Sequence, residues 1–335
     1  MRFGTMNLVP STTDEISEKD FLTDAPQFWK GRRMDLLEDV RAQIEGRALR
    51  SGGWASGNSS QAVTETTCLA LLAIAGGANP ARDRGLHLLT NLQNTDGSWP
   101  AFQGDDAEGC WVTSLAVVTR RHLFPSAAGL QKATRWLLKT KGREGHWFWK
   151  WKFRTVDRRV QFNPDKYGWP WLPGTVSWVI PTAFSLIALE QQFPRCEDQE
   201  IPRRIQLGRE MLRDRACPQG GWNAGNGMVN GAALLPHVDT TAIALLALKE
   251  TPADSVTAVS LRWLRSAAVD CQSEYSLAWA ALAFSIHRDR VFELCIERLL
   301  KSLPKRLLKS NTETLSIAAL ALDAAANDNN PFRTM

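Results

Sequence analysis

A single carboxylate stands at the start of the apolar run PHVDTTAIALLAL, residues 236–248. Asp239 lies two residues after His237 and directly before Thr240, and these three are the candidate catalytic residues. In one interpretation Asp239 accepts hydrogen bonds from the free N–H groups of a helix's first turn and simply caps that helix. In the other it faces an apolar cavity, where desolvation raises its pKa and lets it act as an acid. A neutral His237 would then orient its proton.

Aromatic side chains are the second group that could take part in chemistry. The chain has 14 Trp against two Tyr, and because Trp is costly to expose, many of these rings must line a core, a cavity or a membrane-facing patch. Core packing is the alternative for each ring taken alone. The candidates for a cavity lining at the level of Asp239 are Trp111, Trp169, Trp171, Trp178, Tyr275 and Trp279.

Aromatic and cationic residues alternate in the stretch HWFWKWKFRTVDRR, residues 146–159. A strand-like flap here would place Lys150, Lys152 and Arg154 beside the aromatic rings. Such a flap could be a wedge for a membrane surface, or a lid whose cations hold a diphosphate. A surface loop with solvated cations is the alternative. Trp147 itself is assigned to a repeated turn.

A short helix rich in Ala and Leu, opened by Ser, Thr or Asp, recurs six times along the chain. The copies lie at 63–74, 109–119, 177–189, 238–248, 273–284 and 311–322. Amphipathic helices with apolar residues at i, i+3 and i+4 lie between them. This alternation predicts an inner ring of small-residue helices and an outer ring that faces water. We therefore expect an all-α fold, a closed (α/α)6 toroid.

The toroid is expected over residues 28–323, with an insertion at 146–174. An N-terminal arm (1–27) and a flexible C-terminal tail (324–335) flank it. Between outer and inner helices, a glycine followed by a Trp recurs, where glycine gives the left-handed helix end and Trp covers it. The copies are SGGW (51–54), QNTDGSW (93–99), REGHW (143–147) and QGGW (219–222).

These turns resemble the QW motifs of the triterpene cyclases related to squalene–hopene cyclase, and Gln93–Trp99 is a full copy. The helix starts resemble those of the α/α-toroid that the cyclases share with protein prenyltransferase β subunits. In class II cyclases one inner helix begins Asp-x-Asp-Asp-Thr-Ala, and the middle Asp protonates an alkene or epoxide. The chain reads His237-Val238-Asp239-Thr240-Thr241-Ala242, which keeps the middle Asp and replaces the other two. The resemblance implies an isoprenoid, or its diphosphate, cyclised by protonation from Asp239.

Other chemistries fit the sequence poorly. Protein prenyltransferases bind Zn²⁺ through an Asp-x-Cys pair, whereas Asp239-Thr240-Thr241 offers no thiolate. The aspartates of GDDAEG (104–109) lie between glycines in an expected turn, so no metal site is predicted, and Mg²⁺ would enter only with a diphosphate. Six Cys without a CxxC pair indicate reduced thiols. The net charge of +5 suits anionic lipid or diphosphate partners and not nucleic acid.

Two functions remain open on the sequence. The first is a class II cyclase-like protein whose isoprenoid-derived cation is stabilised by Trp111, Trp178, Trp169 and Trp279. The second is a non-catalytic toroid that holds a lipid or a partner protein. The N-terminus lacks a long apolar stretch, and no run is long enough to cross a bilayer, so we expect a cytoplasmic protein, at most bound to one membrane face. The insertion, a second subunit or a membrane would close the mouth of the ring.

Overall fold

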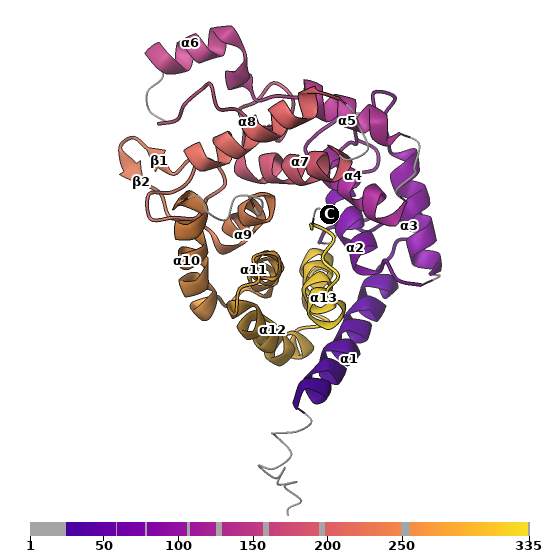
Figure 1. Cartoon of the computed structure of the whole chain (residues 1–335). Coiled ribbons are helices and arrows are strands. Elements are labelled where there is room, and N and C mark those ends of the chain that lie inside the picture. Colours follow the sequence, from indigo (N-terminus) through magenta and orange to yellow (C-terminus); the bar gives the residue numbers. More distant parts are fainter. Residues whose placement is uncertain are drawn as a thin grey trace, which may run out of the picture.

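The computed structural model describes residues 25–333 except 58, 78, 106–107, 125–128, 157–160, 194–197 and 249–254, with side chains from residue 31 onward. Most of the predicted N-terminal arm therefore lies outside the described residues. In the described part, helices form two concentric rings (Figure 1). The inner ring consists of α2 (Thr64–Ala73), α4 (Val112–Leu123), α7 (Val179–Gln192), α9 (Val238–Ala247), α11 (Glu274–Ile286) and α13 (Thr312–Asn327). The outer ring consists of α1 (Ala25–Gly46), α3 (Pro80–Asn91), α5 (Leu130–Lys139), α8 (Glu200–Asp214), α10 (Ser255–Asp270) and α12 (Val291–Ser302).

The ring is closed. Each inner helix packs against the next, and the last one, α13, packs against the first, α2. Inner helices are apolar on nearly all sides because they contact an inner neighbour on either side and an outer helix behind. At the closing contact the Thr66 hydroxyl donates to the Glu313 carboxylate (2.6 Å), and Arg41 of α1 pairs with Asp323 (3.3 Å). The predicted all-α toroid is confirmed.

A buried Trp fixes each of four hairpin turns in the same way. Its backbone N–H donates to a threonine hydroxyl in the following inner helix, and its indole N–H donates to a carbonyl of the preceding outer helix. The four sets are Trp54 with Thr67 and Ile44, Trp99 with Thr113 and Leu89, Trp169 with Thr182 and Leu137, and Trp222 with Thr241 and Leu212. The indole thus satisfies a carbonyl near the outer helix's end, where no helical N–H follows. The third copy is Trp169, so the assignment of Trp147 to this turn is wrong.

We expect Trp99→Phe to destabilise the fold by about 2–4 kcal/mol. The substitution removes the indole N–H that donates to the Leu89 carbonyl (2.7 Å) and shrinks a fully buried ring. Chemical denaturation measures the change. Trp147→Phe is the matched control, because Trp147 is 74% exposed and its ring covers no helix end. Equal losses in the two variants would contradict this account of the turn.

The insertion differs from its prediction. Residues Trp147–Thr155 form helix α6, not a strand-like flap, and none of them is buried. The alternation of aromatic and cationic residues fits a strand, but the spacing of Trp147 and Trp151, at i and i+4, fits a helix equally well. Helix α6 stands outside both rings (Figure 1). Nearby, strands β1 (Met228–Val229) and β2 (Ala232–Ala233) form a two-stranded hairpin whose turn, Asn230–Gly231, has the positive φ angles such a tight turn requires. None of the described helices is long and apolar enough to span a membrane.

Candidate functional site

A chamber of about 140 Å³ lies at the end of the ring where the inner helices begin. Its described lining residues come mainly from the first two turns of the inner helices, in pairs four positions apart. The lining residues are Glu65, Leu69, Trp111, Leu115, Trp171, Ile180, Phe184, Ile243, Tyr275 and Trp279. Residues at i and i+4 share one face of a helix, so each pair faces the ring centre at two successive levels. The repeat that builds the fold therefore also builds the chamber.

Aromatic rings form a connected wall on one side of the chamber. Trp111 contacts Trp171 edge to face, with ring centroids 4.9 Å apart, and contacts Phe184 at 5.8 Å. Phe184 in turn contacts Trp279 at 5.9 Å, and Trp279 contacts Tyr275 at 6.3 Å. Ring faces attract cations through their quadrupoles. This wall can therefore stabilise positive charge that develops inside an apolar chamber.

Glu65 is the acid of the chamber, and the sequence prediction missed it. Burial, and next the negative charge of Glu313, raise the pKa of Glu65 to about 7. One oxygen of Glu313 accepts the hydrogen bond from Thr66, while the other is buried without a partner in the described part of the chain. Two carboxyl groups at one place resist ionising together. A substantial share of the Glu65 carboxyl groups therefore still hold a proton near pH 7.

The signal for Glu65 is present in the repeat. Glu65-Thr66-Thr67 begins α2 just as Asp239-Thr240-Thr241 begins α9. The structure makes the two stretches equivalent, because Thr67 and Thr241 each accept the backbone N–H of a turn Trp. A search guided by this alignment would have named both acids.

Asp239 lies in the first turn of α9, half-buried, and is not among the described lining residues. Capping does not explain it, since α9 has no side-chain cap hydrogen bond and its N-cap residue is His237. The His237 side chain is exposed, and Thr240 is buried. The charge of Asp239 does reach the chamber: burial is the main cause of the raised pKa of Tyr275, and the charges of Glu65, Asp239 and Glu313 add to it. Tyr275 is thus a neutral hydroxyl whose pKa is raised by the charges of three nearby acids.

The structure brings together four of the six predicted cavity aromatics: Trp111, Trp171, Tyr275 and Trp279. Trp169 is buried in its hairpin turn instead. Trp178 is the N-cap residue of α7, and its ring lies so close to Gly225 that a Cβ there would approach it to 3.0 Å. Neither is among the described residues that line the chamber.

The predicted diphosphate-binding cations all lie on α6. Lys150 pairs with Asp165 (3.2 Å), Arg154 pairs with the same carboxylate, and the Lys152 ammonium is 4.7 Å from the centre of the Trp149 ring. They are not among the described residues that line the chamber. No three His, Cys, Asp or Glu side chains converge as a metal site within the described residues.

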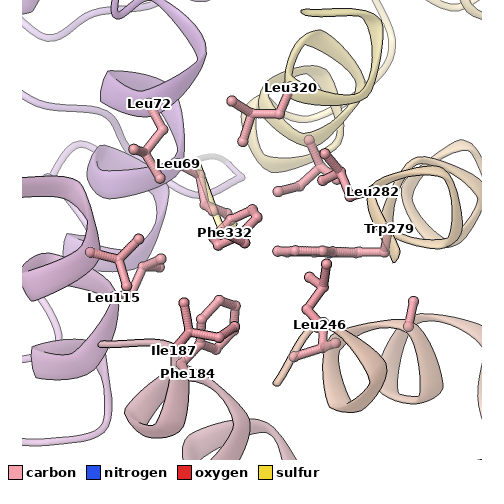
Figure 2. Packing of buried hydrophobic residues seen from close by; sticks show 14 of the residues in the cluster. Leu69, Leu72, Leu115, Phe184, Ile187, Leu246, Trp279, Leu282, Leu320 and Phe332 are labelled. Carbon is pink, nitrogen blue, oxygen red and sulfur yellow. The ribbon is translucent and has the colours of Figure 1, made fainter. Parts of the chain in front are cut away.

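The C-terminal segment closes the ring interior from the other end. Asp328 adopts a left-handed conformation (φ 53°) and ends α13, and the chain then runs into the ring (Figure 1). Phe332 is fully buried, with its ring centroid 5.3 Å from Trp279 and 6.0 Å from Phe184. Figure 2 shows side chains of the inner helices pointing toward Phe332. The prediction of a flexible tail over 324–335 is therefore wrong for residues 324–333, and the last two residues lie outside the described part of the chain.

Polar contacts hold this segment in place. The side-chain amide of Asn330 donates to the Leu282 carbonyl (3.0 Å) and to the Ser285 hydroxyl (2.9 Å). The amide of Gln191 donates to the carbonyl of Pro331 (2.8 Å). The segment is thus bonded to both α7 and α11, and Phe332 packs against Phe184 and Trp279, two of the rings that line the chamber.

We expect Glu65→Gln to stabilise the protein at pH 8 and to leave its stability nearly unchanged at pH 5. The pKa of Glu65 is raised from 4.5 to about 7, so the folded chain holds a proton that the unfolded chain releases between these values. The stability that is present below the pKa of Glu65 in the unfolded chain is therefore lost as pH rises through its pKa in the folded chain. The amide that Glu65→Gln introduces has no acidic proton to lose and avoids this loss. For a half-buried group we expect a gain of about 1–2 kcal/mol. Denaturation at both pH values measures it, with Asp270→Asn, on the exposed end of α10, as the control.

No family model matches the chain, and no curated protein matches it. Solved structures do. The type II terpene cyclase MstE from Scytonema, in complex with its product merosterolic acid A, superposes with a TM-score of 0.58 at 14% identity, covering 89% of this chain and 98% of that one. The same cyclase with its substrate, geranylgeranyl dihydroxybenzoate, gives 0.57 at 13%, with the same coverage. The fold is an α/α toroid.

A second kind of enzyme shares this fold. An α-amylase from Clostridium perfringens superposes with a TM-score of 0.58 at 12% identity, covering 84% of this chain and 96% of that one. Two enzymes with different reactions thus match the chain about equally well. At these identities the likeness defines the arrangement of helices, and function has to be argued from the site.

Proposed function

We propose that this protein binds an isoprenoid chain in the ring chamber and cyclises it by proton transfer from Glu65. The observation that carries this proposal is the composition of the chamber: a carboxyl group among residues that are otherwise apolar or aromatic. A carboxylic acid can protonate an alkene only if it still holds its proton, and burial beside a second carboxyl group favours that state.

The reaction needs no group beyond the chain's own residues. The Glu65 O–H bond breaks as the π electrons of the terminal double bond take the proton, which leaves a carboxylate and a tertiary carbocation. The next double bond attacks this cation and closes a ring. The last cation gives a proton to solvent water and the Glu65 carboxylate takes one back from solvent, so the acid is regenerated and the overall change is an isomerisation. The wall formed by Trp111, Phe184 and Trp279 stabilises the cation, and the apolar lining keeps water away from it.

The size of the chamber suits one end of such a substrate. Its volume of about 140 Å³ is below the ~300–1,000 Å³ typical of pockets that enclose a whole small-molecule ligand. The end that enters would be the terminal isoprene unit, whose double bond then lies beside Glu65. The solved structure with geranylgeranyl dihydroxybenzoate supports an isoprenoid in this fold, since that toroid binds one as substrate.

Asp239, with its neighbours His237 and Thr240, is the second candidate for the acid. It lies at the same level of the ring and its charge acts on Tyr275. We rank it after Glu65 because Glu65 lines the chamber and Asp239 does not.

Glycoside hydrolysis is the alternative raised by the α-amylase likeness, and it requires a pair of carboxyl groups. Glu65 and Glu313 are close enough for the charge of one to raise the pKa of the other. However, a sugar needs many hydrogen-bond partners, and the chamber is lined by Leu, Ile, Phe and Trp side chains. A non-catalytic toroid that holds a lipid is the third possibility.

One assay separates these functions. Purified protein is incubated at pH 6 with squalene, farnesyl diphosphate or geranylgeranyl diphosphate, with and without Mg²⁺, and in parallel with a maltooligosaccharide. Mass spectrometry of the extracts is expected to show a cyclic isomer of at least one isoprenoid and an intact oligosaccharide. Tight binding of an isoprenoid that is never converted would identify the toroid as a carrier. Shortened oligosaccharides would identify a glycosidase.

Helix α6 is proposed as the contact with a membrane surface from which such substrates come. Trp147 and Trp151 are 74% and 55% exposed on a helix that also carries Lys150, Lys152 and Arg154. Trp prefers the interface of a bilayer, and cations favour anionic lipids. We expect the protein to sediment with anionic vesicles and a Trp147→Ala/Trp151→Ala variant to remain in solution.

A further inference from the structure

We propose that a second pocket, beside the chamber, binds an anionic head group of the isoprenoid substrate. This inference rests on the proposed function and specifies its substrate class as amphiphiles with a diphosphate or carboxylate head, as opposed to neutral hydrocarbons. The pocket has a volume of about 650 Å³ and lies between the start of α11 and the loop that joins α12 to α13. Its described lining residues are Ser273, Glu274, Tyr275, Lys305, Arg306, Lys309, Ser310, Asn311 and Thr314.

The pocket carries an excess of positive charge. Lys305, Arg306 and Lys309 come from one loop, and Glu274 is the acid opposite them. Arg306 pairs with Glu274 (3.2 Å), which leaves the two lysines exposed and without an ion-pair partner in the described part of the chain. Ammonium groups that are not neutralised by the protein attract phosphate and carboxylate oxygens. The pocket is therefore complementary to an anion.

The loop that presents these lysines is held in place by the rest of the fold. The Arg47 guanidinium, from the end of α1, donates to the carbonyls of Ser310 (2.6 Å) and Leu307 (3.2 Å). Asn311 ends the loop as the N-cap of α13, where its side chain accepts from the Thr314 N–H (2.9 Å). The backbone that carries Lys305 and Lys309 is thus fixed before any ligand arrives, so binding does not have to order it.

Tyr275 joins the two pockets. It is the residue common to both linings, with the anionic-head pocket on one side and the chamber on the other. For a ligand whose head lies among the lysines, Tyr275 is the side chain that its chain would cross to reach Trp279 and Glu65. On this path the small chamber has to hold only the terminal isoprene unit, and the rest of the chain lies outside it.

Two exposed lysines elsewhere on the surface offer a matched control. Lys132 and Lys141 equal Lys305 and Lys309 in number and charge, but they are not among the described residues of either pocket. The double variants Lys305→Gln/Lys309→Gln and Lys132→Gln/Lys141→Gln are compared with the unmodified chain. Binding of inorganic pyrophosphate is measured by calorimetry at low and high salt. Turnover is measured with geranylgeranyl diphosphate, geranylgeranoic acid and geranylgeraniol.

We expect Lys305→Gln/Lys309→Gln to weaken pyrophosphate binding at least tenfold and to raise the KM for the anionic substrates by a similar factor. The KM for the neutral alcohol should not change in this variant, and no KM should change in the Lys132→Gln/Lys141→Gln variant. The ratio of the KM values for the two anionic substrates distinguishes a diphosphate from a carboxylate head. Equal KM values for acid, diphosphate and alcohol, or an equal loss of pyrophosphate binding in the two variants, would overturn the inference.

The two proposals fail separately. Pyrophosphate binding that depends on Lys305 and Lys309, without any cyclic product, would retain the anion pocket and refute the cyclase. Cyclisation that does not depend on these lysines would retain the cyclase and refute the anion pocket.

Discussion

Glu65→Gln is expected to lower the rate of cyclisation by about 10²–10⁴-fold while the isoprenoid still binds. Glutamine keeps the size and the polarity of the side chain, but it has no acidic proton to give to a double bond. The chamber and its aromatic wall are left in place. Product formation under single-turnover conditions measures the chemical step, and binding of the unreacted chain is measured separately.

Asp239→Asn is the matched comparison, because Asp239 begins α9 as Glu65 begins α2. We expect a smaller loss in this variant. If Glu65 is the acid, the rate of cyclisation by the unmodified protein should be constant below pH about 7 and fall tenfold per pH unit above it, since the pKa of Glu65 is raised to about 7 and only the protonated form reacts. Full activity of Glu65→Gln together with inactive Asp239→Asn would assign the acid to α9.

Phe332→Ala is expected to destabilise the protein by about 3–5 kcal/mol. Phe332 is fully buried between Trp279 and Phe184, and its removal leaves a void that the surrounding inner helices cannot fill. Because the same two rings line the chamber, the void should join it and deepen it. We therefore expect the variant to bind longer apolar chains more tightly than the unmodified protein does, despite its lower stability.

Thermal or chemical denaturation measures the stability of the variant. Competition between farnesyl and geranylgeranyl chains measures its preference for the longer chain, which reports the depth of the chamber. Leu308→Ala serves as the control, since Leu308 is 79% exposed and its truncation should change neither quantity. An unchanged melting temperature for Phe332→Ala would mean that Phe332 is not packed inside the ring. A large loss of stability without altered chain preference would restrict Phe332 to a packing role.

Much of the architecture could be predicted because it follows from periodic signals. The copy expected at 238–248 forms α9 at Val238–Ala247, and the copy expected at 63–74 forms α2 at Thr64–Ala73. Helices that are apolar on nearly all sides must be surrounded, and six of them alternating with amphipathic partners leave a double ring as the simple solution. Chain order and spacing were enough for this conclusion.

The site was harder to predict because it depends on single contacts. Trp147 and Trp169 both follow a glycine-containing stretch, and only the hydrogen bonds to Thr182 and Leu137 show which one belongs to the turn. The family motif directed attention to Asp239, whereas burial beside Glu313 makes Glu65 the acid of the chamber. The tail is rich in Asn and Asp, which is typical of a flexible segment, but the burial of Phe332 and the hydrogen bonds of Asn330 and Pro331 order it inside the ring.

Closure of the ring joins the two ends of the chain. Thr66 and Arg41 bond to Glu313 and Asp323, so the first and last repeats complete one another. An open solenoid can fray from its terminal repeats, whereas here the loss of either end removes a neighbour from the other. Unfolding should therefore be all-or-none. During synthesis, moreover, the contact between α2 and α13 can form only after α13 has left the ribosome, so the ring cannot close before then.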